Sequence, residues 1–342
     1  MILGICGYGY TGSGAFVDLM QASQDVNYMD IGEFNLAYYP DGLEDLRFHL
    51  NEGHARYLSC DIALNRYMQR VDKFLKADNR FTDEQRREIN KITKDFIDSI
   101  TQVEWNGFWS FDFQEASSGL RKVLYRTLYK AYKLRKSNNE HHVFPERKMR
   151  LSIAPDLLDE KIRLYIMTVL EVLGYHKDQI NVIDQVFPAD NPEKYFRFYD
   201  SAYALIVDRD PRDVYILAKK NLGYRAKWIP TDNVQQFIDY FKIIRENEAT
   251  SNAKRILRLN FEDLIYDYFT TIEKISLFTG VDFRDVHSDK FDPAVSINNT
   301  QLFIDAESGL KDDIRCIESN LSPYLYDFGR FEIKPNRLTR AF

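Results

Sequence analysis

Short apolar runs alternate with amphipathic stretches along much of this chain. Apolar residues dominate 1–6 and 203–207 and, less densely, 27–31, 181–185 and 256–260, and polar residues bound each run. Short runs of this kind are typical of parallel strands that are buried on both faces. Segments with helical spacing follow them, for example after residue 14 and from about residue 43. The alternation predicts an α/β fold of three layers, with a mostly parallel central sheet and helices on both faces.

Two segments add to this pattern. Residues 60–150 are charged and helical in spacing, with few strand candidates, so we expect a helical insertion within a single domain spanning 1–342. Residues 153–173 predict an amphipathic helix, with a Pro-Asp start signal at 155–156 and Gly174 as a stop. Within the insertion, Trp105, Phe108 and Trp109 are expected to pack in the core; stacking on a sugar or on adenine is the alternative.

The composition is that of an ordinary globular protein and restricts the classes of partner that it could bind. The 342 residues are 44% hydrophobic and 29% charged, and 46 Lys plus Arg against 52 Asp plus Glu give a net charge of -6, which excludes a general nucleic-acid binder. Cys6, Cys60 and Cys316 are far apart and lack CxxC spacing, so neither a disulfide scaffold nor a zinc site is expected. With no leader-like start and no long apolar run, we expect a cytoplasmic protein.

Positive charge concentrates between residues 119 and 150. This segment holds about ten Lys or Arg and two Glu, a local excess of about +8, with tyrosines interleaved. One interpretation is a solvated helix face. The other is a surface for an anionic glycan or for a membrane.

A glycine-rich loop follows the first apolar run. Gly7 is separated by four residues from Gly12-Ser13-Gly14, between a predicted strand and a predicted helix. This is the spacing of a phosphate-binding loop (P-loop), in which glycines let successive N–H groups turn inward toward an anion at the helix N-terminus. A tight turn that binds nothing is the alternative. In the pattern GxxxxGK[ST], Ser13 stands in place of Lys and Gly14 in place of the magnesium-binding hydroxyl, which argues against triphosphate hydrolysis.

A second motif follows the apolar run 203–207. Residues 208–213 read Asp-Arg-Asp-Pro-Arg-Asp, which places Arg209 at the carboxyl edge of the sheet, where α/β proteins bind ligands. This segment resembles the 3′-phosphate-binding motif of sulfotransferases that use 3′-phosphoadenosine 5′-phosphosulfate (PAPS). Two more segments are similar to that family in the same order: Phe-Glu-Asp-Leu at 261–264, and residues 291–300, with Phe-Asp-Pro followed by Asn298-Asn299.

The resemblance implies a bacterial-type, PAPS-dependent sulfotransferase on a P-loop fold. Such an enzyme moves a sulfuryl group to a hydroxyl acceptor without a metal, and we expect the acceptor to be a saccharide or a surface-glycan precursor. In this family the nucleotide donor would be held by Gly9, Tyr10, Thr11, Gly12, Ser13 and Gly14 at the phosphosulfate, by Arg209 at the 3′-phosphate, and by Asn298 and Asn299. The family's loop Lys, which steadies the leaving oxygen, aligns with Tyr10, so Tyr10 takes this catalytic position and another cation would have to do the work of the Lys. The family's second 3′-phosphate ligand aligns with Leu217, and Tyr215, Lys219 or Lys220 could compensate for it.

The acceptor side needs a base beside the glycine loop. Glu33 follows the second predicted strand and resembles, in position, the glutamate base of glycan sulfotransferases; a hydrated turn carboxylate is the alternative. His49 and His54 are the next candidates. Asp184 and Gln185 end another predicted strand and are expected to bind the acceptor, because an ionised carboxylate beside the transferring anion would repel it.

Two other functions stay open. A nucleotide kinase or triphosphatase would use Asp208, at the end of an apolar run, to hold magnesium. A non-catalytic nucleotide- or glycan-binding protein on the same fold is the third possibility, because Tyr10 replaces the family's Lys.

Overall fold

The central sheet has five parallel strands, and the first strand lies in the middle. The computed structural model describes residues 1–77, 79–108, 119–134, 146–220, 228–249, 254–284, 286, 288–331 and 335. Along the sheet the order is β2 (Val26–Tyr28), β5 (Ile180–Asp184), β1 (Ile2–Gly7), β6 (Ala202–Asp208) and β7 (Ile256–Asn260). Each neighbouring pair is parallel. The predicted α/β fold is therefore confirmed.

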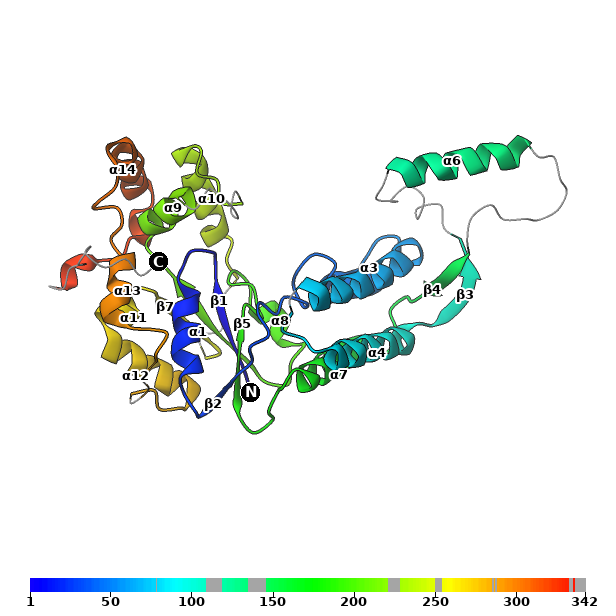
Figure 1. Cartoon of the computed structure of the whole chain (residues 1–342), viewed down its shortest axis with the longest axis horizontal. Helices are drawn as coiled ribbons and strands as arrows, with labels where there is room; N and C mark the ends of the chain where they lie inside the picture. Colours follow the sequence, from blue (N-terminus) through cyan, green and yellow to red (C-terminus); the bar gives the residue numbers. More distant parts are fainter. Residues whose placement is uncertain are drawn as a thin grey trace.

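Helices cover both faces of this sheet (Figure 1). Along β1, Ile2 and Cys6 belong to the hydrophobic cluster on one face, and Leu3 and Ile5 to the cluster on the other. The second face is covered by α1 (Ser13–Gln21), α11 (Asp263–Tyr266) and α12 (Tyr268–Thr279). Against the first face pack α8 (Glu193–Phe196) and α7 (Leu158–Val172). Burial on both faces explains why the strands are almost uniformly apolar.

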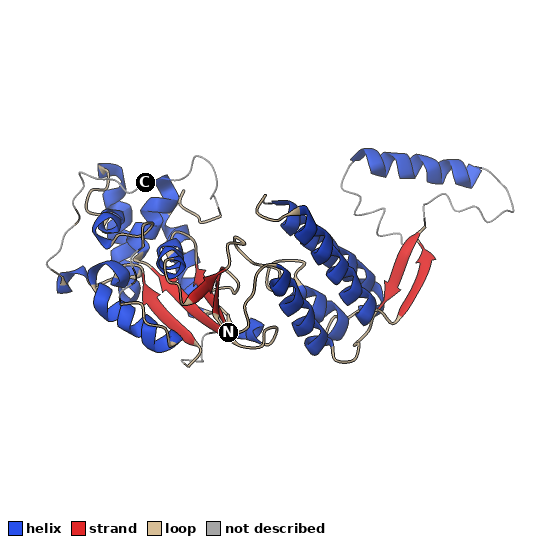
Figure 2. Ribbon diagram, turned by 60° about the horizontal axis from the view of Figure 1, so that its bottom comes forward, coloured by secondary structure: helices blue, strands red, loops and turns tan. Residues whose placement is uncertain are grey.

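A helical unit lies beside the sheet (Figure 2). It is built from α2 (Leu43–Asn51), α3 (Arg56–Ala77), α4 (Asp83–Ile100) and α7. At the start of α4, Thr82 and Gln85 form a capping box, which satisfies free amides of the first turn. One continuous hydrophobic cluster runs from Ile183 of the sheet to Leu64 and Ile97 of these helices, so the two parts share a core.

A two-stranded hairpin interrupts the predicted helical insertion. In it, β3 (Val103–Gly107) pairs antiparallel with β4 (Arg147–Leu151), and α6 (Gly119–Leu134) lies beyond it, away from the sheet in both views (Figures 1 and 2). Trp105 is 43% exposed and Phe108 36% exposed, so the prediction that they pack in the core is wrong. Trp105 lies in β3, of which all but the last residue are exposed, and Phe108 directly follows this strand. Trp109 lies outside the described residues.

The remaining helices gather near the carboxyl ends of the strands. They are α9 (Pro211–Lys220), α10 (Val234–Glu246), α13 (Pro293–Ser296) and α14 (Lys311–Asn320). After β1 the chain crosses to β2 on one side of the sheet, and β6 lies on the other side. This reversal creates a switch point at the carboxyl end of β1, where open α/β sheets bind their ligands. Among the described helices, none is long and apolar enough to cross a bilayer.

Candidate active site

The glycine loop, residues 7–14, connects β1 to α1 at this switch point. Its backbone has positive φ at Gly9 (84°), Tyr10 (56°) and Gly12 (84°). Successive left-handed residues before a helix turn main-chain amides toward one side, as in an anion-binding nest. Ala15 N–H donates to the Gly12 carbonyl over 3.1 Å, so the amide of Ser13 precedes the intrahelical hydrogen bonds and faces the N-terminal end of α1.

Side chains brace this loop from within and from β5. Thr11 is buried, and its hydroxyl accepts a hydrogen bond from the Tyr8 amide (3.3 Å). Gln185, with a φ of 48°, accepts from the Gly7 amide (3.3 Å) and donates to the Ser13 hydroxyl (3.4 Å). The structure thus places Gln185 against the glycine loop, while the expectation that Gln185 binds the acceptor stays a prediction. Ser13 keeps its own O–H proton to donate.

Tyr10 occupies the position of the family's Lys, but its ring does not supply a cation. The ring packs against a cluster that includes Val214 of α9 and Phe237 of α10. Elsewhere on the loop, the Arg245 guanidinium lies 3.8 Å from the centroid of the Tyr8 ring. A catalytic role for Tyr10 stays a prediction.

Arg209 joins three segments that are far apart in the sequence. The side chain is only 6% exposed, and Nη1 donates to the Tyr10 carbonyl oxygen over 3.1 Å. Nη2 donates to the carbonyl oxygen of Asn299, and the guanidinium stacks on the Phe261 ring at 4.6 Å from its centroid. The Nε atom is buried without an acceptor among the described residues. The glycine loop, the arginine motif and the late loop therefore meet at one guanidinium.

The late loop is anchored by main-chain and side-chain contacts. Asn298 and Asn299 lie in the 3₁₀ turn η1 (Ile297–Asn299), and the Asn298 side chain is buried. Thr300 shares a hydrogen bond of 2.6 Å with the Tyr266 hydroxyl. The structure thus brings this loop to the candidate nucleotide site through the Asn299 carbonyl, and contact of either Asn side chain with a nucleotide stays a prediction.

Gly12 is required where the loop meets Phe261. A Cβ at Gly12 would lie 2.5 Å from Cδ2 of Phe261, and the φ of 84° disfavours any L side chain. We expect Gly12→Ala to lower the free energy of unfolding by about 2–5 kcal/mol, from left-handed strain of about 1–2 kcal/mol and overpacking of about 1–3 kcal/mol. Urea denaturation measures this loss.

Gly14 provides a matched control two residues away. A Cβ there meets no atom within 4 Å, and the residue is already helical. Gly14→Ala should therefore stabilise the protein by about 0.5–1 kcal/mol. Equal effects of the two substitutions would show that the contact with Phe261 is not tight.

Two buried acids lie close to Arg209. Asp213 and Glu262 are fully buried, and each has one carboxylate oxygen without a hydrogen-bond partner among the described residues. Burial raises the pKa of Asp213 to about 7 and that of Glu262 to about 8, while the positive charge of Arg209 acts in the opposite direction. The Arg209 guanidinium therefore lies beside two carboxyl groups that are partly protonated near neutral pH.

Glu262 makes stability depend on pH. Because its folded pKa of about 8 exceeds the ordinary value of 4.5, the folded protein holds a proton between these pH values that the unfolded chain has lost. The free energy of unfolding should therefore fall as pH rises through this window, and Glu262→Gln should make that fall shallower. Urea titrations from about pH 5 to pH 8 measure the slope. Asp213 still titrates in the Glu262→Gln variant, so a smaller pH dependence of the free energy of unfolding remains. Identical slopes for the variant and the wild type would contradict the assignment of this pH dependence to Glu262.

Tyr215 and Lys219 are turned toward α14. The Tyr215 hydroxyl donates to Asp313 Oδ2 (2.6 Å), and Lys219 Nζ donates to both Tyr215 (2.7 Å) and Asp313 (3.0 Å). Lys220 is an exposed residue at the end of α9. Two of the three residues expected to replace the family's second 3′-phosphate ligand are thus engaged with a carboxylate, and the role of all three in nucleotide binding stays a prediction.

A closed network of charges ties the glycine loop to β6, β7 and the end of α10. Asp208 Oδ1 lies 2.5 Å from Arg245 Nη1, and Oδ2 lies 2.6 Å from Arg258 Nη1. Glu248 completes the network with the same two arginines and accepts from the Tyr8 hydroxyl (2.5 Å). Both oxygens of Asp208 therefore face guanidinium groups, which disfavours the magnesium role that a kinase would need.

Glu33 and Asp184 form the acidic side of the site. The Phe34 amide donates to the Asp184 carbonyl oxygen (3.1 Å), which holds the loop containing Glu33 against the end of β5. Glu33 is exposed, whereas Asp184 is half-buried and its Oδ1 is buried with no hydrogen-bond partner among the described residues. Burial, and then the charge of Glu33, raise the pKa of Asp184 to about 6. The structure thus brings two predicted site residues together as a carboxylate pair.

His49 lies elsewhere. It occupies the last turn of α2, with its ring 5.6 Å from that of Phe48, and α2 packs on α3 of the helical unit. The structure records no contact between His49 and the glycine loop within the part of the chain it describes. Catalytic roles for His49 and for Glu33 both stay predictions.

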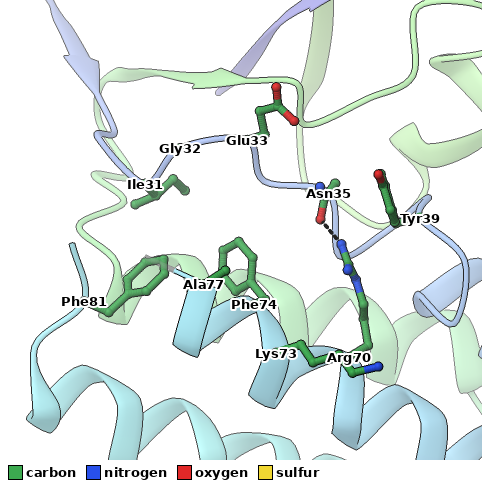
Figure 3. A pocket seen from close by; sticks show the side chains of 10 residues that line it. All are labelled: Ile31, Gly32, Glu33, Asn35, Tyr39, Arg70, Lys73, Phe74, Ala77 and Phe81. Atoms are coloured by element: carbon green, nitrogen blue, oxygen red, sulfur yellow. Dashed lines mark hydrogen bonds between the residues drawn. The ribbon is translucent and has the colours of Figure 1, made fainter. Parts of the chain in front are cut away.

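A cavity of about 330 Å³ opens beside Glu33 (Figure 3). The loop after β2 forms one wall, and α3 together with Phe81 forms the other. Figure 3 shows the Glu33 carboxylate turned away from α3, toward the neighbouring loops. The cavity therefore lies between the candidate base and the helical unit.

In the described part of the basic segment, the cations of β4 have carboxylate partners. On β4, Arg147 donates to Asp61 (2.6 Å), Lys148 pairs with Glu104 (2.6 Å), and Arg150 is buried near the same Glu104. On α6, in contrast, Arg126 and Lys130 are exposed. Arg135 and Lys136 lie outside the described residues. Binding of a glycan or a membrane by this segment stays a prediction.

Comparison with known proteins finds weak similarity to solved structures. No family model and no curated protein matches the sequence. Among solved structures, the chain is similar to the sulfotransferase domain of the Synechococcus PCC 7002 olefin synthase, with 13% identity, a TM-score of 0.40 and coverage of 96% of this chain and 95% of that one. It is also similar to the sulfotransferase domain of the curacin biosynthetic pathway, with the same identity and TM-score and coverage of 94% and 97%. At this level of similarity, the residues of the site have to carry a functional conclusion.

Proposed function

We propose that this chain is a sulfotransferase that moves a sulfuryl group from PAPS to a hydroxyl acceptor. The observation that carries the proposal is the position of Arg209, which hydrogen-bonds the carbonyls of Tyr10 and Asn299 and stacks on Phe261. The sequence segments that resemble the PAPS-dependent family thus converge on one guanidinium. A chance resemblance of separate segments would not require them to meet.

The residues present fit the anionic donor in part. The amide of Ser13 at the start of α1 and the Ser13 hydroxyl suit the phosphosulfate end, and Arg209 suits the 3′-phosphate. The Lys that the family uses to steady the leaving oxygen is absent, because Tyr10 stands at its position and packs its ring against the hydrophobic cluster of α9 and α10. We propose that the main-chain amides of the glycine loop and the Ser13 hydroxyl take over this role.

The chemistry is an in-line displacement. Glu33 accepts the proton of the acceptor hydroxyl, and the oxygen attacks sulfur as the bond between sulfur and the phosphate oxygen breaks. The products are the sulfate ester and adenosine 3′,5′-bisphosphate. Asp184, whose pKa is raised to about 6, is a second carboxyl group that interacts electrostatically with Glu33. The free thiols Cys6, Cys60 and Cys316 fit a reducing compartment, and we propose that the protein acts in the cytoplasm.

Ligand-dependent stability tests the donor. A ligand that binds only the folded state raises the melting temperature in proportion to the logarithm of its concentration above Kd. We expect adenosine 3′,5′-bisphosphate to stabilise the protein and Mg-ATP to have little effect. The reverse result would favour a kinase, and would contradict the conclusion that the two arginines paired with Asp208 disfavour a magnesium role for it.

Turnover tests the reaction. Transfer of radiolabelled sulfate from PAPS to a panel of saccharides would establish the activity. Binding of the bisphosphate without transfer to any acceptor would instead support a non-catalytic nucleotide-binding protein on the same fold.

A further inference from the structure

The cavity beside Glu33 has two chemically distinct ends. Its apolar end is lined by Ile31, Phe74, Ala77 and Phe81, and the rings of Phe74 and Phe81 lie 5.2 Å apart. Arg70 and Lys73 lie at the other end, on successive turns of α3 (Figure 3). A volume of about 330 Å³ is within the range of small-molecule pockets.

Arg70 is held in place without a carboxylate partner. Its guanidinium stacks on Tyr39 at 4.4 Å from the ring centroid, and Nη2 donates to the Asn35 side chain. Its Nε is buried and has no acceptor among the described residues. Neither Arg70 nor Lys73 forms an ion pair with any residue that the structure describes, whereas most other cations of α3, such as Lys76 with Asp72, have one.

The one carboxylate of the cavity lining does not neutralise these cations. Figure 3 shows Glu33 turned away from α3, while Arg70 reaches toward Asn35 and Tyr39 and Lys73 lies along the helix beside it. An oriented guanidinium that lines a cavity is suited to a carboxylate or phosphate group. The positive end therefore has room for a negative group that the protein does not provide.

We propose that the cavity binds the acceptor, and that this acceptor carries an anionic group beside its reactive hydroxyl. The inference rests on the proposed function, because it assigns the reactive hydroxyl to Glu33. The carboxylate or phosphate contacts Arg70 and Lys73, and the C–H face of the ring that bears the hydroxyl packs on Phe74 and Phe81. An acidic saccharide unit has all three features: hydroxyls, an anionic group and an apolar ring face.

Binding of three matched compounds, measured by calorimetry without any donor, tests this inference. They are the p-nitrophenyl β-glucoside, the corresponding glucuronide and the corresponding 6-phosphate, which differ only at one carbon. We expect the two charged compounds to bind about 10- to 100-fold more tightly than the neutral one, as charge-assisted contacts provide. The preference should weaken as salt is raised, because Lys73 is exposed. A preference for only one of the two charged compounds identifies carboxylate or phosphate as the group.

Substitutions on α3 locate the effect. Lys73→Gln and Arg70→Gln should each remove most of the preference, and Lys73 is exposed, so its variant keeps the fold. Lys76→Gln, one turn further along α3 and outside the cavity, is the matched control and should keep the preference. Equal affinity for the three compounds, or no binding of the charged ones at millimolar concentration, would overturn the inference.

The outcomes separate this inference from the proposed function. Because no donor is present, a charge preference that depends on Arg70 can be observed even if PAPS is not the donor. Sulfuryl transfer to neutral acceptors without any charge preference would keep the proposed function and refute the acceptor class.

Discussion

Replacing Arg209 by Ala is expected to abolish the binding of adenosine 3′,5′-bisphosphate. The substitution removes the proposed 3′-phosphate ligand and also the two hydrogen bonds that hold the carbonyls of Tyr10 and Asn299 together. It leaves Asp213 and Glu262 buried without their nearby cation. Loss of one partner from a buried charge cluster costs about 3–5 kcal/mol. We expect this destabilisation to be largest at pH 8, and smaller near pH 5, where both acids are protonated.

Arg209→Lys separates binding from stability. Lysine keeps the positive charge beside the two acids but cannot bridge two carbonyls as the planar guanidinium does. This variant should retain much of the stability, measured by urea denaturation, while its affinity for the bisphosphate, measured by calorimetry, falls at least about tenfold. Lys274→Ala, which removes an exposed cation of α12, is the control. Unchanged affinity in both Arg209 variants would exclude the 3′-phosphate role.

Glu33→Gln is expected to reduce turnover by about 10²-fold or more, because an amide cannot take the acceptor's proton. Its affinity for adenosine 3′,5′-bisphosphate should not change, since Glu33 lines the acceptor cavity and the structure records no contact between it and the described glycine loop. Steady-state kinetics with PAPS and a responsive acceptor gives the loss in kcat. The effect should appear in kcat rather than in the KM for the donor.

Asp30→Asn is the matched control for this experiment. Asp30 is an exposed carboxylate of the same loop, 3.7 Å from Arg80, and does not line the cavity. It should leave turnover within about twofold of wild type, as surface changes away from a site do. If Glu33→Gln turned over normally, the base would lie elsewhere, and Asp184, with its raised pKa and partnerless oxygen, would be the next residue to test.

Local patterns were sufficient to predict most of the sheet. The apolar runs at 181–185, 203–207 and 256–260 correspond to strands that begin and end within about one residue of them. The run at 27–31 gives a shorter strand, because β2 ends at Tyr28 before the chain turns at Gly32, where φ is 67°. The hairpin of β3 and β4 was missed because its strands are separated by about 40 residues and neither is strongly apolar.

Several features of the site had no sequence signal. Gln185 braces the glycine loop across 178 residues of sequence. The Trp228 ring packs against the glycine loop, where a Cβ at Gly9 would lie 2.1 Å from it. The network of charges around Asp208 includes Arg245 from the end of α10, Glu248 just after it and Arg258 from β7. Each depends on which side chains the fold brings together, and spacing along one chain does not contain that information.

The sequence by itself determined the glycine loop, the order of strands and helices, and the arginine that ends the fourth strand of the sheet in chain order, because backbone conformation and burial of short segments depend on neighbouring residues. Only the tertiary structure decided that Arg209 contacts the loop's carbonyls, that Glu33 lies beside Asp184, and that Arg70 faces an apolar cavity without a carboxylate partner. The reason is physical: hydrogen bonds, pKa shifts and unpaired charges are set by distances between residues that are remote in sequence, and these distances exist only once the sheet and the helical unit share a core.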